Sequence, residues 1–171
     1  MDRHTAPSNA ERPRAAHVSP RPSVLIAEHD TQSLDTMLAA LAEARYAVEY
    51  VKDGADALRM LKRMPPPLIL VADEDLPRFG GFQLADLLSL TPGAIARYSA
   101  IVLTNSLGTA LCPPMRCAPN TIFLEALVRP LRAAELLMAL DLAACRLDGG
   151  IAPDVPGALN TGERAETPYP A

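Results

Sequence analysis

The chain has 171 residues, of which 49% are hydrophobic and 21% are charged, and its net charge is −4. This balance is typical of a globular domain, and an acidic chain is a poor match for nucleic acid, which favours a basic face. No segment approaches the roughly 18 consecutive apolar residues of a membrane span, and the first twenty residues lack the apolar region of a secretory signal, so we expect no membrane contact and a cytoplasmic location.

Both ends of the chain are poor in residues that a core could bury. Residues 1–22 contain repeated prolines and arginines, and residues 149–171 are rich in proline and glycine. Such compositions are typical of disordered tails. We therefore expect one domain over residues 23–148, between two disordered tails.

The first half of this domain alternates apolar runs with helix-period segments. Residues 24–28 (VLIAE) predict a strand, and residues 46–51 alternate in polarity, which favours a strand at a sheet edge. Between them, the helical spacing of four apolar residues predicts a helix with one apolar face: Leu34, Met37, Leu38 and Leu41. Asp30 or Thr31 is expected to cap this helix. A second helix is predicted to stop at the prolines 65–67, with three residues facing inward: Leu58, Leu61 and Met64.

The second half predicts three more strands. Residues 68–73 (LILVAD) are the most apolar and belong at the buried centre of a parallel sheet. A third helix around Ala85 precedes strands over residues 100–105 and 122–128, and a last helix follows. Residues 106–120 contain Pro113, Pro114 and Pro119, which argue against a long regular helix there.

Five strands, each followed by a helix or a helix-sized segment, predict an α/β domain with a doubly wound parallel sheet. Functional groups of such sheets lie beyond the carboxyl ends of the strands. The residues there are Glu28, His29, Asp30, Asp73, Thr104, Asn105 and Arg129.

These residue types suit phosphoryl chemistry. A carboxylate can accept a phosphoryl group when nearby groups neutralise the transferring oxygens. Asp73 is the candidate nucleophile and Glu28 a carboxylate for a hard cation, while Thr104 offers a hydroxyl and Arg129 a basic group.

Four stretches, VLIAEHD, LILVADEDLPRFGGFQL, AIVLTN and LVRPL, resemble the signature stretches of response-regulator receiver domains from two-component signalling. The resemblance spans about residues 23–147 and implies a flavodoxin-like five-stranded sheet in the order 2-1-3-4-5, with the fourth helix remodelled or missing here. It makes Asp73 the phosphoacceptor, Thr104 the switch hydroxyl and Arg129 the basic residue that contacts the phosphoryl group.

The resemblance also implies an acidic pocket and a magnesium site. The pocket comprises Glu28, His29 and Asp30, and Mg²⁺ would be held by Glu28, Asp73 and the backbone carbonyl of Asp75. His29 stands where receivers usually have Asp, and imidazole suits softer metals than Mg²⁺, so we expect weak or absent magnesium binding. Ala126 stands where the family has an aromatic switch residue.

The function that the resemblance implies is signalling in a two-component system or phosphorelay, by protein–protein contact and without enzymatic activity. The expected partners are a sensor histidine kinase, a phosphotransfer protein or a regulated target protein. The alternative is a pseudo-receiver, a scaffold that binds its partner without being phosphorylated. His29 and Ala126 favour the alternative, whereas Asp73, Thr104 and the cation at Arg129 favour phosphorylation.

Overall fold

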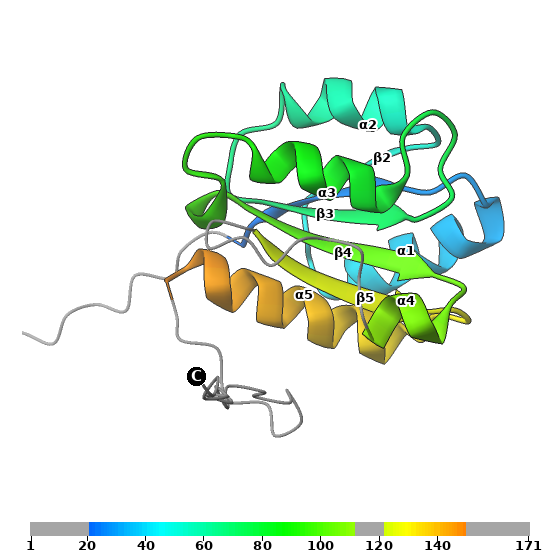
Figure 1. Ribbon diagram of the computed structural model, residues 1–171. Coiled ribbons are helices and arrows are strands. Elements are labelled where there is room, and N and C mark those ends of the chain that lie inside the picture. Colours follow the sequence, from blue (N-terminus) through cyan, green and yellow to red (C-terminus); the bar gives the residue numbers. More distant parts are fainter. Residues whose placement is uncertain (1–20, 112–121, 150–171) are drawn as a thin grey trace, which may run out of the picture.

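A computed structural model describes residues 21–111 and 122–149 of the chain. Five parallel strands form one sheet in the order β2-β1-β3-β4-β5 (Figure 1). The strands are β1 (Ser23–Ala27), β2 (Val48–Val51), β3 (Leu68–Asp73), β4 (Tyr98–Thr104) and β5 (Phe123–Val128). The predicted fold class and strand order are both confirmed.

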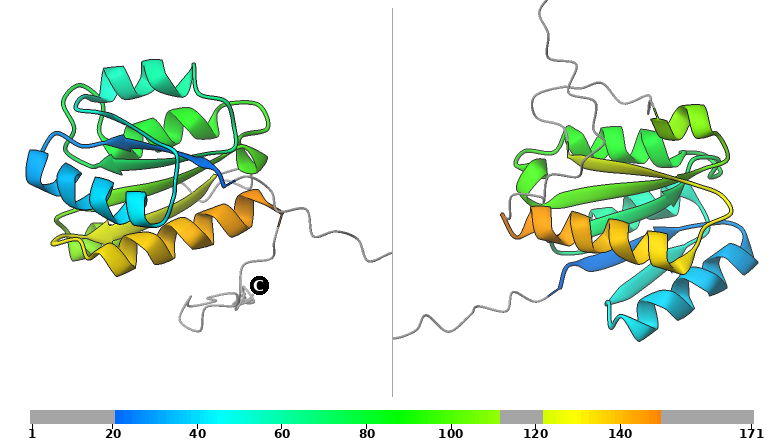
Figure 2. Two further views of the ribbon diagram at one scale, coloured as in Figure 1. Left: turned by 180° about the vertical axis from the view of Figure 1, so that it is seen from behind. Right: turned by 90° about the horizontal axis from the view of Figure 1, so that it is seen from below.

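Helices cover both faces of the sheet. They are α1 (Thr31–Glu43), α2 (Gly54–Leu61), α3 (Gly81–Ser89), the 3-10 helix η1 (Ala94–Ala96), α4 (Leu107–Leu111) and α5 (Ala133–Leu147). Helices α2 and α3 lie on one face and α1 and α5 on the other (Figures 1 and 2). Within the described residues, no helix is long and apolar enough to cross a lipid bilayer.

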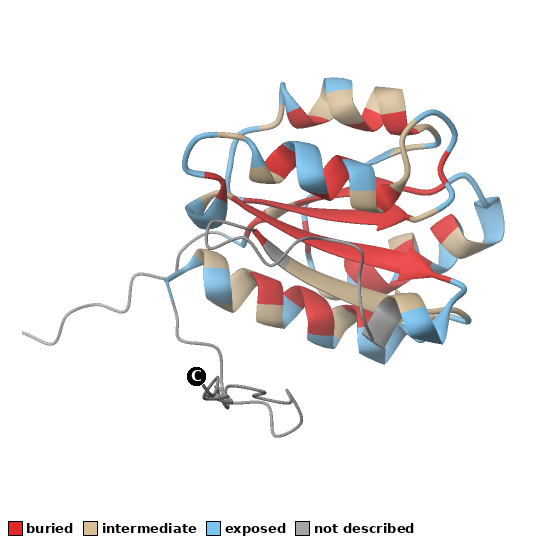
Figure 3. Ribbon diagram, viewed as in Figure 1, coloured by how far each residue is buried: buried red, intermediate tan, exposed pale blue. Residues whose placement is uncertain are grey.

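The sheet separates two apolar layers, and β3 contributes to both of them. Ile69 and Val71 pack with α1 and α5, while Leu68, Leu70 and Ala72 pack with α2 and α3. All six residues of β3 are buried, as the colours of Figure 3 show for the centre of the sheet. Because alternate residues of β3 face opposite layers, both sides of this central strand are apolar.

Local sequence signals place most of the element boundaries. Asp30 caps α1, because its side chain accepts a hydrogen bond of 2.7 Å from the backbone N–H of Ser33. The alternating strand β2 lies at the sheet edge, as predicted, with Glu49 and Tyr50 exposed. Helix α4 has five described residues. Residues 112–121 lie outside the described parts of the chain, as do residues 1–20 and 150–171 of the two predicted tails.

One helix boundary differs from the prediction. Helix α2 ends at Leu61 and does not continue to the prolines, because the N–H groups of Arg63 and Met64 both donate to the carbonyl of Met60 in a closing turn. Met64 therefore lies beyond the helix, although it still packs, partly buried, against the α2/α3 layer.

The loop between β3 and α3 is attached to the N-terminus of α2. The N–H of Gly54 donates to the carbonyl of Pro77 at 3.0 Å, and the side chain of Arg78 pairs with Asp53 at 2.6 Å. A Cβ atom at Gly54 would lie 2.0 Å from the carbonyl oxygen of Phe79. This close approach of two backbones therefore requires glycine at position 54.

Candidate functional site

The carboxyl ends of β1, β3 and β5 bring two carboxylates and one guanidinium together. Arg129, directly after β5, donates from Nη2 to Oε2 of Glu28 and to Oδ2 of Asp73, the latter at 3.0 Å. Its Nη1 donates to the hydroxyl of Ser33 on α1 at 2.7 Å. The peptide bond between Arg129 and Pro130 is cis. Arg129 thus connects the end of β5 to the ends of β1 and β3 and to α1.

This ion cluster is withdrawn from solvent. Glu28 is fully buried, Asp73 is 4% exposed, and the side chain of Arg129 is 19% exposed. Burial by itself lowers the pKa of Arg129, but the hydrogen bonds and charges of Glu28 and Asp73 outweigh burial and raise this pKa above its ordinary value. The guanidinium therefore remains charged and neutralises one of the two buried carboxylates.

Every oxygen of the two carboxylates faces a donor. Oε1 of Glu28 accepts from the N–H of Asp30, and Oδ1 of Asp73 accepts from the N–H of Asp75, both at 2.9 Å. The half-exposed imidazole of His29 places Nδ1 3.6 Å from Glu28 and 3.5 Å from Asp73. His29 therefore lies beside the carboxylates as a neighbour of both.

The donor set fits magnesium poorly. Glu28, His29 and Asp73 offer potential ligand atoms that all lie within 4.8 Å of one another. One of the three is an imidazole, whereas Mg²⁺ prefers oxygen ligands, and the Arg129 guanidinium already contacts both carboxylates. Its positive charge repels a second cation from the same two groups.

Thr104, the predicted switch hydroxyl, contacts Glu74 in this structure. Its buried hydroxyl donates to Oε1 of Glu74 at 2.6 Å, and the N–H of Asn105 donates to the same oxygen at 2.8 Å. Glu74 was absent from the sequence-based candidates. The signal that could have identified it is the parallel register, which pairs Asp73 with Leu103 and so sets the next residue, Glu74, beside Thr104.

The remaining predicted site residues lie at the margin. Asp30 contributes its backbone N–H to Glu28 while its side chain caps α1, and the exposed Asp75 contributes its N–H to Asp73. Ala126 on β5 is partly buried. The structure thus brings Glu28, His29, Asp73 and Arg129 together and turns the Thr104 hydroxyl towards Glu74.

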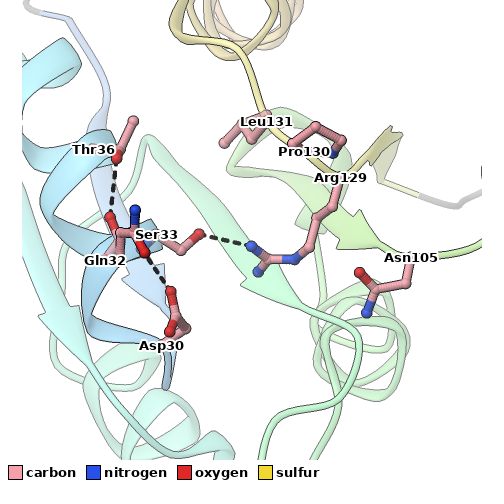
Figure 4. A pocket seen from close by; sticks show the side chains of 8 residues that line it. All are labelled: Asp30, Gln32, Ser33, Thr36, Asn105, Arg129, Pro130 and Leu131. Atoms are coloured by element: carbon pink, nitrogen blue, oxygen red, sulfur yellow. Dashed lines mark hydrogen bonds between the residues drawn. The ribbon is translucent and has the colours of Figure 1, made fainter.

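A pocket of about 550 Å³ adjoins this cluster, between α1 and the loop that follows β5 (Figure 4). It is lined by Asp30, Gln32, Ser33, Thr36, Asn105, Arg129, Pro130 and Leu131. Figure 4 shows the Arg129 side chain extending across the pocket towards Ser33. The ion cluster can therefore be approached from this side.

No protein-family model matches the chain, and no curated protein matches it either. Solved structures do match. The chemotaxis response regulator CheY4 of Vibrio cholerae is 19% identical with a TM-score of 0.61, and the match covers 72% of this chain and 99% of that one. The signal receiver domain of an HD domain-containing protein from Pseudomonas fluorescens is 22% identical with a TM-score of 0.63, over 80% of this chain and 96% of that one.

A third structure is the receiver domain of the sensor histidine kinase PA1611 from Pseudomonas aeruginosa, which has a magnesium ion coordinated in its active-site cleft. It is 21% identical with a TM-score of 0.58, and the match covers 77% of this chain and all of that one. The strand order and these similarities together show that the chain has the receiver fold.

Proposed function

We propose that this chain is a response-regulator-like signalling protein with Asp73 as its phosphoacceptor and protein–protein binding as its output. The observation that carries the proposal is the position of Asp73. It is an almost buried carboxylate at the carboxyl end of the central strand of a receiver fold, with a guanidinium 3.0 Å away. Similarity to the receiver domains of a chemotaxis regulator and a sensor kinase supports this role.

The proposed reaction is phosphoryl transfer from a phosphohistidine of a sensor histidine kinase or a phosphotransfer protein. An oxygen of Asp73 attacks phosphorus, an O–P bond forms, and the N–P bond of the phosphohistidine breaks. The histidine nitrogen leaves with the electron pair and takes up a proton from water. Arg129 offers a fixed positive charge to the transferring oxygens, and a guanidinium can bind such oxygens in a bidentate way.

The proposed output is a change in binding to a regulated target protein in the cytoplasm, with no catalytic turnover by this chain and no nucleic-acid partner. The acidic net charge of −4 supports a protein partner over nucleic acid. Phosphorylation would add negative charge at the end of β3, where Arg129 and the ends of the neighbouring strands meet.

A second candidate function is favoured by one observation. Arg129 is bonded to both Glu28 and Asp73, and the Thr104 hydroxyl is bonded to Glu74, so the basic group and the hydroxyl of the site have internal partners without a phosphoryl group. A pseudo-receiver would use this arrangement as a fixed scaffold that binds its partner constitutively.

Mass spectrometry of the intact protein after incubation with a small acyl phosphate, with and without magnesium, distinguishes the two. The phosphoacceptor proposal expects one added phosphoryl group that is lost in Asp73→Asn. A matched control is Asp35→Asn, which removes an exposed carboxylate from α1 and should leave the modification intact. If no variant or condition gives an adduct, and a phosphorylated phosphotransfer protein also gives none, the pseudo-receiver function stands.

A further inference from the structure

We infer that Glu74 regulates the proposed phosphoacceptor site by occupying hydrogen-bond donors that a phosphoryl group on Asp73 would need. The inference rests on the proposed function of Asp73. In this inference, the Glu74 carboxylate accepts the hydrogen bonds of Thr104 and Asn105 at the end of β4, and phosphorylation of Asp73 is faster when this carboxylate is displaced.

The contact is built by the strand register. Asp73 pairs with Leu103, and the N–H of Glu74 donates to the carbonyl of Leu103 at 2.9 Å, which continues the β3–β4 pairing by one residue. The Glu74 side chain therefore starts beside the end of β4. Its Oε1 receives both the Thr104 hydroxyl, at 2.6 Å, and the N–H of Asn105, at 2.8 Å.

Two donors aimed at one anionic oxygen form an oxyanion site. The Thr104 hydroxyl is fully buried, so it requires an acceptor, and Glu74 is the acceptor in this structure. Charge-assisted hydrogen bonds of this kind are stronger than neutral ones. These two hydrogen bonds therefore hold the Glu74 carboxylate in a defined position at the end of β4.

A phosphoryl group on Asp73 would compete with the Glu74 carboxylate for these two donors. Asp73 and Glu74 are consecutive residues, and the donors at the end of β4 lie on the strand next to theirs. On the other side, the Arg129 guanidinium is engaged by Glu28 and Asp73. If the Glu74 side chain alone moves away, a transferred phosphoryl group can therefore accept hydrogen bonds from the Thr104 hydroxyl and the N–H of Asn105.

Glu74 is suited to leave, because it is only partly buried, whereas Asp73 and Glu28 are buried. Rotation about its side-chain bonds would move the carboxylate into water without moving the strand. In this inference, the phosphoryl group on Asp73 replaces the Glu74 carboxylate as the acceptor of the two hydrogen bonds at the end of β4.

The test compares Glu74→Ala, Glu74→Gln and a matched control, Glu49→Gln, which makes the same chemical change on the exposed edge strand β2. The first readout, amide hydrogen exchange of Asn105 by NMR, does not depend on phosphorylation. We expect exchange to become about tenfold faster in Glu74→Ala, since one charge-assisted hydrogen bond corresponds to at least that factor. In Glu74→Gln, which keeps an acceptor oxygen, a smaller increase is expected.

The second readout is the initial rate of Asp73 phosphorylation by a small acyl phosphate. We expect an increase of about tenfold in Glu74→Ala, an intermediate value in Glu74→Gln and no change in Glu49→Gln. Asn105 exchange that is the same in wild type and Glu74→Ala would overturn the inference. So would a phosphorylated wild type whose rate is unaffected by Glu74→Ala. If Asn105 exchange changes but no variant is phosphorylated, the proposed function of Asp73 fails, and the gating role fails with it.

Discussion

Nη2 of Arg129 lies 3.0 Å from Oδ2 of Asp73, so the candidate phosphoacceptor is paired with a cation before any phosphoryl group arrives. The same nitrogen also contacts the fully buried Glu28. Removing one member of a buried ion pair leaves an uncompensated charge, which is costly because the low-dielectric interior cannot solvate it.

We therefore expect Arg129→Met to lower the free energy of unfolding by about 3–5 kcal/mol at neutral pH. Urea denaturation measures this loss. Arg132→Met is the control, because the Arg132 side chain is 82% exposed and lies 4.0 Å from Glu135, and such a surface pair contributes about 0–1 kcal/mol. Equal losses in the two variants would contradict a structural role for the cluster.

His29→Asp should strengthen magnesium binding by roughly tenfold or more, because a carboxylate beside Glu28 and Asp73 adds one hard oxygen ligand and one negative charge. The imidazole that it replaces lies 3.5 Å from Asp73. Calorimetric titration with Mg²⁺ provides the measurement. Ala96→Asp, which adds an exposed carboxylate on η1, controls for net charge, and an equal gain there would show that the effect is nonspecific.

Tyr46→Phe should reduce stability by about 0.5–1.5 kcal/mol at pH 8, because the Tyr46 hydroxyl donates to Asp141 at 3.0 Å. Phenylalanine retains the ring beneath the Arg21 guanidinium, which lies 4.8 Å from the ring centre. Burial and the interaction with Asp141 raise the pKa of Tyr46 from 10.0 to about 12.

The sign of this pKa shift sets a pH window. A raised pKa in the folded state contributes stability that is fully present below pH 10 and is lost as the pH rises towards 12. Urea unfolding across this range should show the difference between wild type and Tyr46→Phe shrinking at alkaline pH. A difference that stays constant to pH 12 would rule out the shift.

Glu125→Gln should raise stability at neutral pH. Burial raises the pKa of the Glu125 carboxyl above its ordinary value of 4.5, and the charge of Arg146 opposes this only in part. The ionised carboxylate is therefore less favourable in the folded state than in the unfolded one. The advantage of the variant should diminish as the pH falls from the raised pKa to about 4.5, below which the carboxyl is protonated in both states. Thermal unfolding between pH 4 and pH 8 checks this, with Glu49→Gln as the exposed control.

Gly54→Ala should destabilise the fold by about 1–3 kcal/mol or more, because its Cβ would lie 2.0 Å from the carbonyl oxygen of Phe79, and a backbone atom cannot move away cheaply. Gly108→Ala is the matched control. Among the described residues, its Cβ would meet the Ser106 side chain alone, at 3.6 Å, and alanine is favoured over glycine in a helix by roughly 0.5–1 kcal/mol. Similar effects at both positions would contradict the close contact at Gly54.

The sequence was sufficient for the fold because its signals are local and periodic. The run at residues 68–73 predicted the central strand, and the alternation near Val48 predicted an edge strand. The start of α1 was predicted at Asp30 or Thr31, and Asp30 is the cap. The end of α2 was missed because a closing turn on the carbonyl of Met60 stops the helix before the prolines do.

The site was predicted only in part. The strand-end rule brought Glu28, Asp73 and Arg129 together as expected, but it does not specify which side chain each group will contact. Thr104 has Glu74 as its partner because of the β3–β4 register, which is a property of the assembled sheet. The roles assigned to these residues from the family resemblance, including phosphorylation of Asp73, stay predictions.

The loop of residues 74–80 is fixed at both ends, and the two attachments differ in stiffness. At the α2 end, a backbone hydrogen bond from Gly54, an ion pair to Arg78 and a backbone contact at Phe79 act together, so movement there requires a shift of the whole helix. At the β4 end, the side-chain attachment is the Glu74 carboxylate, which can turn about single bonds. A disturbance at Asp73 should therefore travel towards β4, where the loop yields more easily, and only weakly towards α2.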